Sequence, residues 1–87
     1  MRLMDALAEE LPVLRASLRI SQDELSKRIG VSRQTYSAIE TLKQPMTWIT
    51  FMALIAFFEN NPKTAKLLDS LGFYENEDFI ACIQYLK

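Results

Sequence analysis

The spacing of leucines near the start of the chain predicts an amphipathic helix. These leucines recur every three or four residues and so line one side of a helix: Leu3, Leu7, Leu11, Leu14 and Leu18. Pro12 lies inside this stretch, and a proline within a helix removes one amide donor and distorts the backbone. We therefore expect the helix to kink or split near residue 11, with one piece at about 2–10 and a second at about 12–19.

End signals predict the next two helices. Ser21, with Glu24 three residues later, forms a capping box, and Gly30 can take the left-handed conformation that ends a helix. Ser32 can cap a new helix only two residues after that glycine. The inner faces of these two helices are expected to hold Leu25, Ile29, Tyr36 and Ile39.

A long apolar stretch follows a short loop. Pro45 favours a loop over Thr41–Met46, and Thr47 can cap a helix that runs to about Glu59. The middle of that helix, Phe51–Phe58, is apolar on nearly every side, so we expect it at the centre of the core.

Two more helices are predicted near the C-terminus. Asn61 as cap and Pro62 as first helical residue start one helix, which Gly72 ends. Asn76, followed by two acidic residues, starts the last. Their apolar residues exceed the needs of a short tail, and some should pack on the 47–59 helix: Leu67, Leu68, Leu71, Phe73, Phe79, Ile80, Ile83 and Leu86.

Composition agrees with a helical domain. The chain has 87 residues, of which 49% are hydrophobic, with only two glycines and three prolines, so helix breakers are scarce. We expect one all-α domain over residues 1–87. Its architecture should be a compact bundle of five to six helices, with a helical extension at about 61–87.

Most enzyme and cofactor chemistry is excluded by residue type. The chain has no histidine and one cysteine, Cys82, so a single chain cannot form a Cys/His zinc site, a disulfide or a histidine-activated nucleophile. We expect no enzymatic activity, no metal and no cofactor. The N-terminus carries acids unlike a signal peptide, and no apolar run is long enough to cross a bilayer, so we expect a cytoplasmic protein.

Basic residues are concentrated in one part of the chain. The net charge of −1 and pI near 5.3 argue weakly against nucleic-acid binding. However, residues 12–50 hold six basic and three acidic groups, a balance of +3, whereas residues 1–11 and 51–87 each sum to −2. A positive surface is therefore expected around the middle helices.

Those middle helices have the pattern of a helix-turn-helix at residues 22–41. The tight turn Ile29–Ser32 joins two short helices whose apolar positions let them cross and share a core. The outer face of the second helix is then left free. A helix presented in this way fits the major groove of B-form DNA.

The segment LRASLRISQDELSKRIGVSRQTYSAIE (Leu14–Glu40) resembles the phage Cro and repressor type of helix-turn-helix, also called the xenobiotic-response-element family. The likeness extends more loosely to about Glu59. It rests on the combination of SQ-x-EL, IGVSRQT and the closing IE. The resemblance implies a lambda-repressor-like helical domain, often dimeric, that acts on promoter or operator DNA.

The resemblance also implies site residues. Base edges would be contacted by Arg33, Gln34, Ser37 and Ala38. Phosphates and the DNA backbone would be approached by Gln22, Ser32, Thr35, Lys43, Gln44 and Thr47. Gln22 would also brace the recognition helix, and Arg15 with Glu40 would form an internal ion pair. Independently, arginine suits guanine and glutamine suits adenine, because each can form two hydrogen bonds to that base.

Two positions depart from the family pattern. Leu42 stands where a glycine usually follows the recognition helix, and a leucine adopts positive φ only at a cost. Ser26 replaces a common alanine but is small enough to fit between the helices.

Several conspicuous side chains have structural interpretations. Tyr36 is expected in the core and Trp48 over the recognition helix, while Cys82 should be an inert, half-buried thiol. Lys27 and Arg28 are expected on a solvated face rather than on DNA.

These observations favour a sequence-specific DNA-binding transcriptional regulator, a repressor, whose partners are double-stranded DNA and a second copy of the chain. Apolar residues of the C-terminal helices that remain uncovered would form the two-fold interface. Antitoxins that bind their own promoters belong to this class, which would add a toxin as protein partner. The alternative is a protein-interaction module that keeps the helix-turn-helix shape with little DNA affinity.

Overall fold

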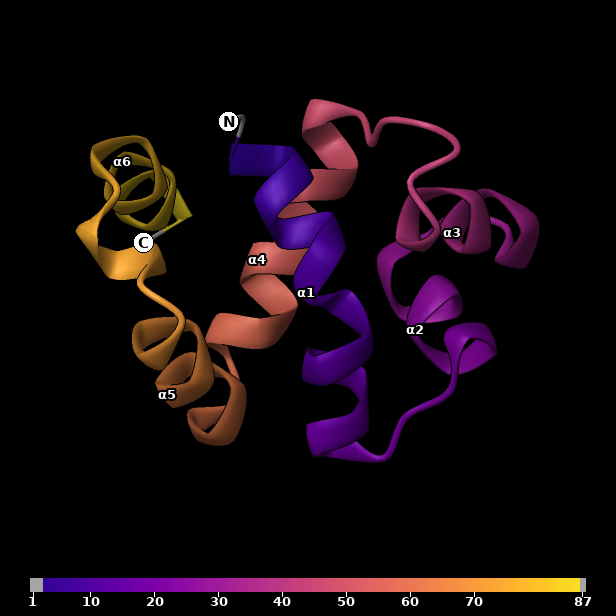
Figure 1. The fold of residues 1–87 in the computed structure, drawn as a ribbon, viewed down its shortest axis with the longest axis horizontal. Coiled ribbons are helices and arrows are strands. Elements are labelled where there is room, and N and C mark those ends of the chain that lie inside the picture. The colour runs from indigo at the N-terminus through magenta and orange to yellow at the C-terminus, as the bar shows by residue number, and fades with distance from the viewer. Residues whose placement is uncertain (1–2, 87) are drawn as a thin grey trace.

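The computed structural model describes residues 3–86, which contain six α-helices and one short 3₁₀-helix (Figure 1). The elements are α1 (Leu3–Leu18), α2 (Gln22–Ile29), α3 (Arg33–Glu40), α4 (Trp48–Glu59), α5 (Pro62–Ser70), η1 (Phe73–Glu75) and α6 (Glu77–Leu86). The described residues contain no strand, so the predicted all-α class is confirmed.

The predicted end signals of α2 and α3 are confirmed. Ser21 Oγ accepts a hydrogen bond of 3.0 Å from the backbone N–H of Glu24, and the Glu24 carboxylate accepts one of 3.4 Å from the Ser21 N–H. Gly30 ends α2 in the left-handed conformation with a φ of 80°. Ser32 caps α3 by accepting a hydrogen bond from the backbone N–H of Thr35. These caps satisfy amide groups that have no partner within the helix.

The prediction that Pro12 splits the first helix is wrong. One continuous helix, α1, runs through Pro12. Pro12 is exposed, whereas Leu7, Leu11 and Leu14 on the other side are fully buried. We attribute the continuity to this burial, since the apolar stripe on both sides of the proline can be covered only if the two halves stay aligned.

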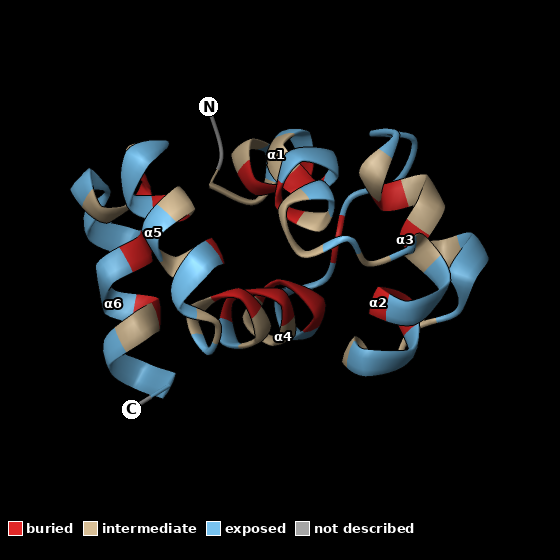
Figure 2. Ribbon diagram, turned by 90° about the horizontal axis from the view of Figure 1, so that it is seen from below, coloured by how far each residue is buried: buried red, intermediate tan, exposed pale blue. Residues whose placement is uncertain are grey.

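The core lies between α1 and α4 and extends toward both ends of the molecule (Figure 2). Helix α1 packs against α3 and α5, and α4 packs against α2, α5 and α6. The predicted central position of α4 is confirmed, because its inner side is buried. The largest fully buried side chains are Tyr36, Phe51, Phe58, Phe79, Leu7, Leu11, Leu14, Leu25, Ile39, Leu54, Ile55 and Leu68.

Helices α2 and α3 lie at one end of the molecule, and α5 and α6 lie at the other (Figure 1). The predicted packing of the C-terminal residues on α4 is confirmed, since Leu68, Phe73 and Phe79 are buried in the shared core. In the described part of the chain, no helix has the length and apolar character needed to cross a membrane.

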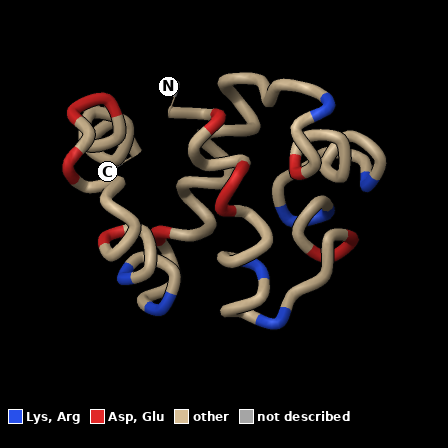
Figure 3. The backbone as a smooth tube through the Cα atoms, in the orientation of Figure 1, with Lys and Arg blue, Asp and Glu red and all other residues tan. Residues whose placement is uncertain are grey.

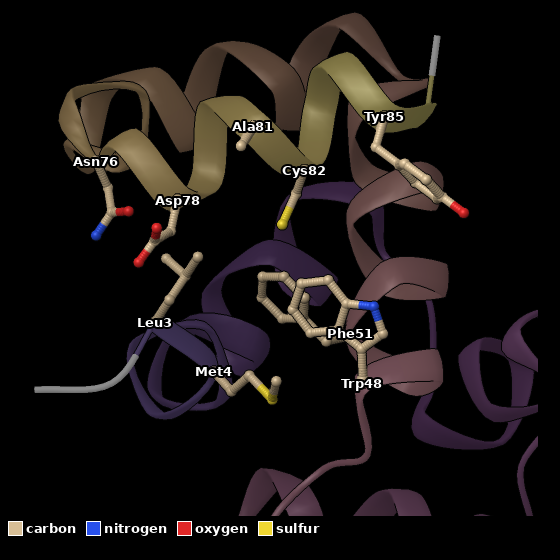
Figure 4. Close-up of a pocket in the computed structure, with 9 residues that line it drawn as sticks. All are labelled: Leu3, Met4, Trp48, Phe51, Asn76, Asp78, Ala81, Cys82 and Tyr85. Carbon is tan, nitrogen blue, oxygen red and sulfur yellow. The ribbon is translucent and has the colours of Figure 1, made fainter.

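Trp48 lies away from α3, which corrects the expected position over the recognition helix. Its ring stacks on that of Phe51 with 5.5 Å between the ring centroids, and the residue remains 54% exposed. Figure 4 shows Trp48 at the edge of a groove between α1 and α6, and the sulfur of Cys82 points into the same groove. Cys82 is more buried than expected, and burial raises the pKa of its thiol. Because α4 is apolar on all sides, its sequence does not fix which side faces which neighbour.

Leu42 takes the left-handed conformation that a glycine would take at this point, with a φ of 65°. Three backbone hydrogen bonds hold the predicted loop after α3. The Leu42 N–H donates to the carbonyl of Ile39 at 3.1 Å, and the N–H groups of Lys43 and Gln44 both donate to the carbonyl of Ala38 at 2.9 and 3.2 Å. The loop therefore follows a tight path in spite of the leucine, at the cost of local backbone strain.

Candidate nucleic-acid interface

Helix α3 presents one side to solvent and rests on the core with the other. Arg33 and Gln34 are exposed and Ser37 is half-buried, while Tyr36 and Ile39 have exposed fractions of 0% and 1%. The exposed and the buried residues alternate along α3 because an α-helix places residues three and four apart on the same face. The buried pair fixes the orientation of the helix and so keeps the polar side chains facing outward.

The outward face forms a shallow hollow with the loop after α3. It is lined by Arg33, Gln34, Ser37, Ala38, Thr41 and Lys43. The structure thus brings together all four residues expected at base edges and one of those expected at the DNA backbone. Arginine, amide and hydroxyl groups in one hollow supply both donors and acceptors, which base edges require.

Thr41 lines this hollow and was missed by the sequence reasoning. It follows Ser37 by four residues and Gln34 by seven. Helical periodicity therefore indicates that Thr41 shares their face, although it lies just after the last residue of α3. Its hydroxyl donates a 2.8 Å hydrogen bond to the carbonyl of Ser37. Thr41 itself is exposed at the surface.

The other expected contact residues lie outside the hollow. Ser32 and Thr35 sit at the start of α3, where the Ser32 hydroxyl donates to the Thr35 hydroxyl at 3.0 Å. Thr47 caps α4 by accepting a 3.1 Å hydrogen bond from the backbone N–H of Thr50. Gln44 is exposed and lines a separate groove between the loop and α1. The first turn of α3 and the loop therefore flank the hollow.

A network of three polar side chains ties α1, α2 and α3 together. Arg15 holds Glu40 with two hydrogen bonds, from Nε to Oε2 at 2.9 Å and from Nη2 to Oε1 at 2.8 Å. Gln22 Nε2 donates to the same Glu40 Oε1 at 3.1 Å, and Arg15 Nη1 donates to the carbonyl of Ile20 at 3.0 Å. Gln22 thus connects the start of α2 directly to the end of α3.

These contacts shift the pKa values of Arg15, Glu40 and the neighbouring Tyr36. The hydrogen bond to Glu40 is the main cause that raises the pKa of Arg15. Burial acts to raise the pKa of Glu40, but the hydrogen bonds from Arg15 and Gln22 and the charge of Arg15 outweigh it, so the pKa lies below its ordinary value. Burial, followed by the neighbouring Glu40 carboxylate, raises the pKa of Tyr36. Near neutral pH the network therefore holds one cation and one anion.

Comparison with known families agrees with this geometry. The sequence profile of the family described as "Helix-turn-helix" matches residues 14–47. The matched residues include α2 and α3, so this part of the chain is similar to that family. The family resemblance drawn from the sequence is thereby confirmed, and with it a general role in DNA-binding regulation. No curated protein and no solved structure matches the chain significantly.

Charge is unevenly distributed around the helix-turn-helix (Figure 3). Arg33 and Lys43 line the hollow, and the acidic residues Glu77 and Asp78 stand in the first turn of α6, at the opposite end of the molecule. Lys27 is paired with Asp23 at 3.2 Å in solvent, and the Arg28 guanidinium lies 5.9 Å from the centre of the Phe57 ring. Positively charged residues therefore lie beside the exposed face of α3, although the net charge of the whole chain is −1.

Proposed function

We propose that the chain is a sequence-specific transcriptional repressor that reads the major groove of double-stranded DNA with α3. The observation that carries this proposal is the exposure of Arg33, Gln34 and Ser37 on a helix supported from beneath by Tyr36 and Ile39. None of the described C-terminal segment contributes to the hollow that these residues line. The face is therefore open to a ligand as large as a DNA duplex.

The side chains of the hollow supply specific base contacts. Arg33 can donate two hydrogen bonds to O6 and N7 of guanine, Gln34 can pair bidentately with adenine, and the Ala38 methyl group can pack on the methyl of thymine. Each bidentate pair contributes about 1–3 kcal/mol of discrimination between bases. Thr41 adds a hydroxyl oxygen and a methyl group at the far end of the hollow.

Contacts to phosphates would position α3 in the groove. Lys43 lies beside the hollow and supplies a positive charge. Ser32 and Thr35 place hydroxyl groups at the start of α3, where free amide groups also favour an anion. Gln22 would reach a phosphate while bracing Glu40, and Gln44 and Thr47 would approach the backbone from the loop side.

Repression would follow from occupancy of a promoter. A domain bound in the major groove excludes polymerase from the same base pairs without any catalytic step. Transcription in vitro should therefore fall when a selected site overlaps the promoter and stay unchanged when the site is moved well upstream. A rise in transcription from either template would contradict the repressor role.

Binding to DNA selected from a random duplex library tests the proposal. The affinity should fall steeply as salt rises, because bound phosphates release counterions. The double variant R33A/Q34A should lose about 100-fold or more on the selected site and far less on random duplex. The matched control K63A/K66A removes two exposed basic residues of α5 at the other end of the molecule and should keep the discrimination. Equal losses on both duplexes would contradict base reading by α3.

The acidic composition favours a second candidate function. With a net charge of −1 and a pI near 5.3, the chain would also suit a protein-interaction module that keeps the helix-turn-helix shape with little DNA affinity, such as an antitoxin component that binds a toxin but not DNA. That function predicts no salt-dependent binding to any duplex. The same titration therefore separates the two candidates.

A further inference from the structure

A groove between α1, the start of α4 and α6 takes no part in the proposed function. Its volume is about 670 Å³, which lies within the range of about 300–1,000 Å³ typical of sites for small molecules (Figure 4). Apolar side chains make up much of its lining, among them Leu3 and Met4 of α1, Phe51 of α4 and Ala81 of α6. It shares no residue with the hollow beside α3. We call it the α1–α6 groove.

Two large aromatic side chains stand exposed at the rim of this groove. Trp48 at the start of α4 is 54% exposed, and Tyr85 near the end of α6 is 82% exposed. The stacking of Trp48 on the buried Phe51 ring holds the indole in place. Figure 4 shows both rim residues toward one end of the groove and the Asp78 carboxylate toward the other. The faces of aromatic rings attract a cation that lies within about 6 Å, and tryptophan does so most strongly.

The charge of the groove has one sign. Asp78 is the only charged side chain that lines it in the described part of the chain, and no described residue forms an ion pair with this carboxylate. Burial, followed by the charge of Asp78, raises the pKa of the Cys82 thiol, so the thiol stays neutral near pH 7. A cleft with apolar walls and one sign of charge concentrates the electric field and favours a ligand of the opposite charge.

We infer that the α1–α6 groove binds a small organic cation that carries apolar or aromatic substituents. The substituents would lie against the apolar lining formed by Leu3 and Met4. The positive charge would face Asp78 and the exposed rings of Trp48 and Tyr85. An anion of the same shape would be repelled by the carboxylate, and a neutral molecule would keep the apolar contacts but lose both electrostatic ones.

The start of α6 does not reverse this preference. A helix N-terminus attracts anions through N–H groups that have no partner within the helix. Here the Asn76 side chain accepts a hydrogen bond of 3.0 Å from the backbone N–H of Phe79. Glu77 and Asp78 in the first turn supply the negative charge that this end of the helix favours. The chain therefore meets this demand itself, and the groove stays attractive to a cation.

Two ions of the same shape and opposite charge test the inference on the full chain. Tetraphenylphosphonium is a cation and tetraphenylborate an anion, and both carry the same phenyl rings around one central atom. Trp48 is the only tryptophan of the chain, so its fluorescence reports on this groove. The cation should change the emission of Trp48 in a saturable way, at concentrations about tenfold below those at which the anion does so.

Two exposed residues of the groove supply variants that keep Trp48 and should keep the fold. D78N removes the carboxylate and should raise the dissociation constant of tetraphenylphosphonium about fivefold, and Y85L removes a ring and should raise it about threefold. The matched control E77Q alters an exposed carboxylate in the same turn of α6 that does not line the groove. It should bind the cation as the wild type does, and helical circular dichroism checks that every variant is folded.

Three results would overturn the inference. They are an emission of Trp48 that neither ion changes, an equal response to both ions, and equal affinities of D78N and E77Q for the cation. The last result would assign any preference to the net charge of the chain and not to the groove. No DNA enters these measurements, so the groove and the repressor proposal stand or fall separately.

Discussion

At the scale of single residues, strain and charge are concentrated beside α3. Leu42 holds a left-handed backbone that is costly for any side chain with a Cβ atom, and its side chain is 57% exposed. We predict that L42G raises the free energy of unfolding by about 0.5–1 kcal/mol, because relief of strain exceeds the entropy that glycine adds to the unfolded chain.

Urea denaturation would measure this change, and Leu71 supplies a matched control. Leu71 also follows a helix and is partly exposed, but its φ is −82°. L71G should therefore lower the free energy of unfolding by about 1 kcal/mol. A loss of stability in both variants would show that φ at residue 42 is not the source of strain.

Glu40 makes the stability of the domain depend on pH. Its pKa in the folded chain lies below the ordinary value of 4.5, so the unfolded chain takes up the proton more readily. The stabilisation is therefore complete above that value and is lost as the pH falls below it and through the lower pKa of the folded chain. We predict that E40Q lowers the free energy of unfolding by about 1–3 kcal/mol at neutral pH. The gap to the wild type should shrink between roughly pH 5 and pH 2.

Denaturation at a series of pH values measures this gap. The control E9Q alters an exposed carboxylate on α1 and should keep the wild-type pH profile. A constant gap between E40Q and the wild type over the whole series would mean that the Arg15–Glu40 pair does not couple stability to protonation.

At the scale of elements, α1 stays continuous although Pro12 removes an amide donor from its interior. We predict that P12A raises the free energy of unfolding by about 1–3 kcal/mol, because alanine restores that donor and has the highest helix propensity. The adjacent V13A, also exposed, should change stability much less. Thermal unfolding of both variants is the check, and a destabilised P12A would indicate that the proline itself supports the fold.

The helix ends could be predicted because their signals are local. Ser21, Gly30 and Ser32 each act on amide groups within a few residues, so the sequence nearby contains the whole interaction. The path of α1 and the side on which Trp48 lies could not be predicted in this way. Both depend on packing between segments that are distant along the chain, and packing can override a local preference.

In the candidate site, too, some features could be predicted from the sequence and others could not. Periodicity placed Arg33, Gln34 and Ser37 on one face, and the structure gathers them in one hollow. Thr41 was missed because it stands at the boundary between α3 and the loop, where periodicity alone does not decide membership of a face. The placement of Lys43 beside the hollow depends on the tight turn at Leu42, whose conformation the leucine did not indicate.

At the scale of the whole molecule, the recognition helix α3 lies at one end, and α5 and α6 lie at the other. We predict that the DNA selected by the wild type contains two half-sites whose centres lie about one helical turn apart, roughly 34–36 Å. Sequencing of the selected pool checks this, and a single asymmetric site of a few base pairs would contradict a two-fold complex.

A loss-of-contact titration determines whether α3 reads base edges. The affinities of the wild type and R33A are measured on the selected duplex and on duplexes with one base pair replaced at a time. We predict one base pair per half-site whose replacement weakens binding of the wild type by about 1–3 kcal/mol but leaves the affinity of R33A unchanged. If R33A and the wild type lose affinity equally at every position, Arg33 reads no base and the assignment of the α3 face is contradicted.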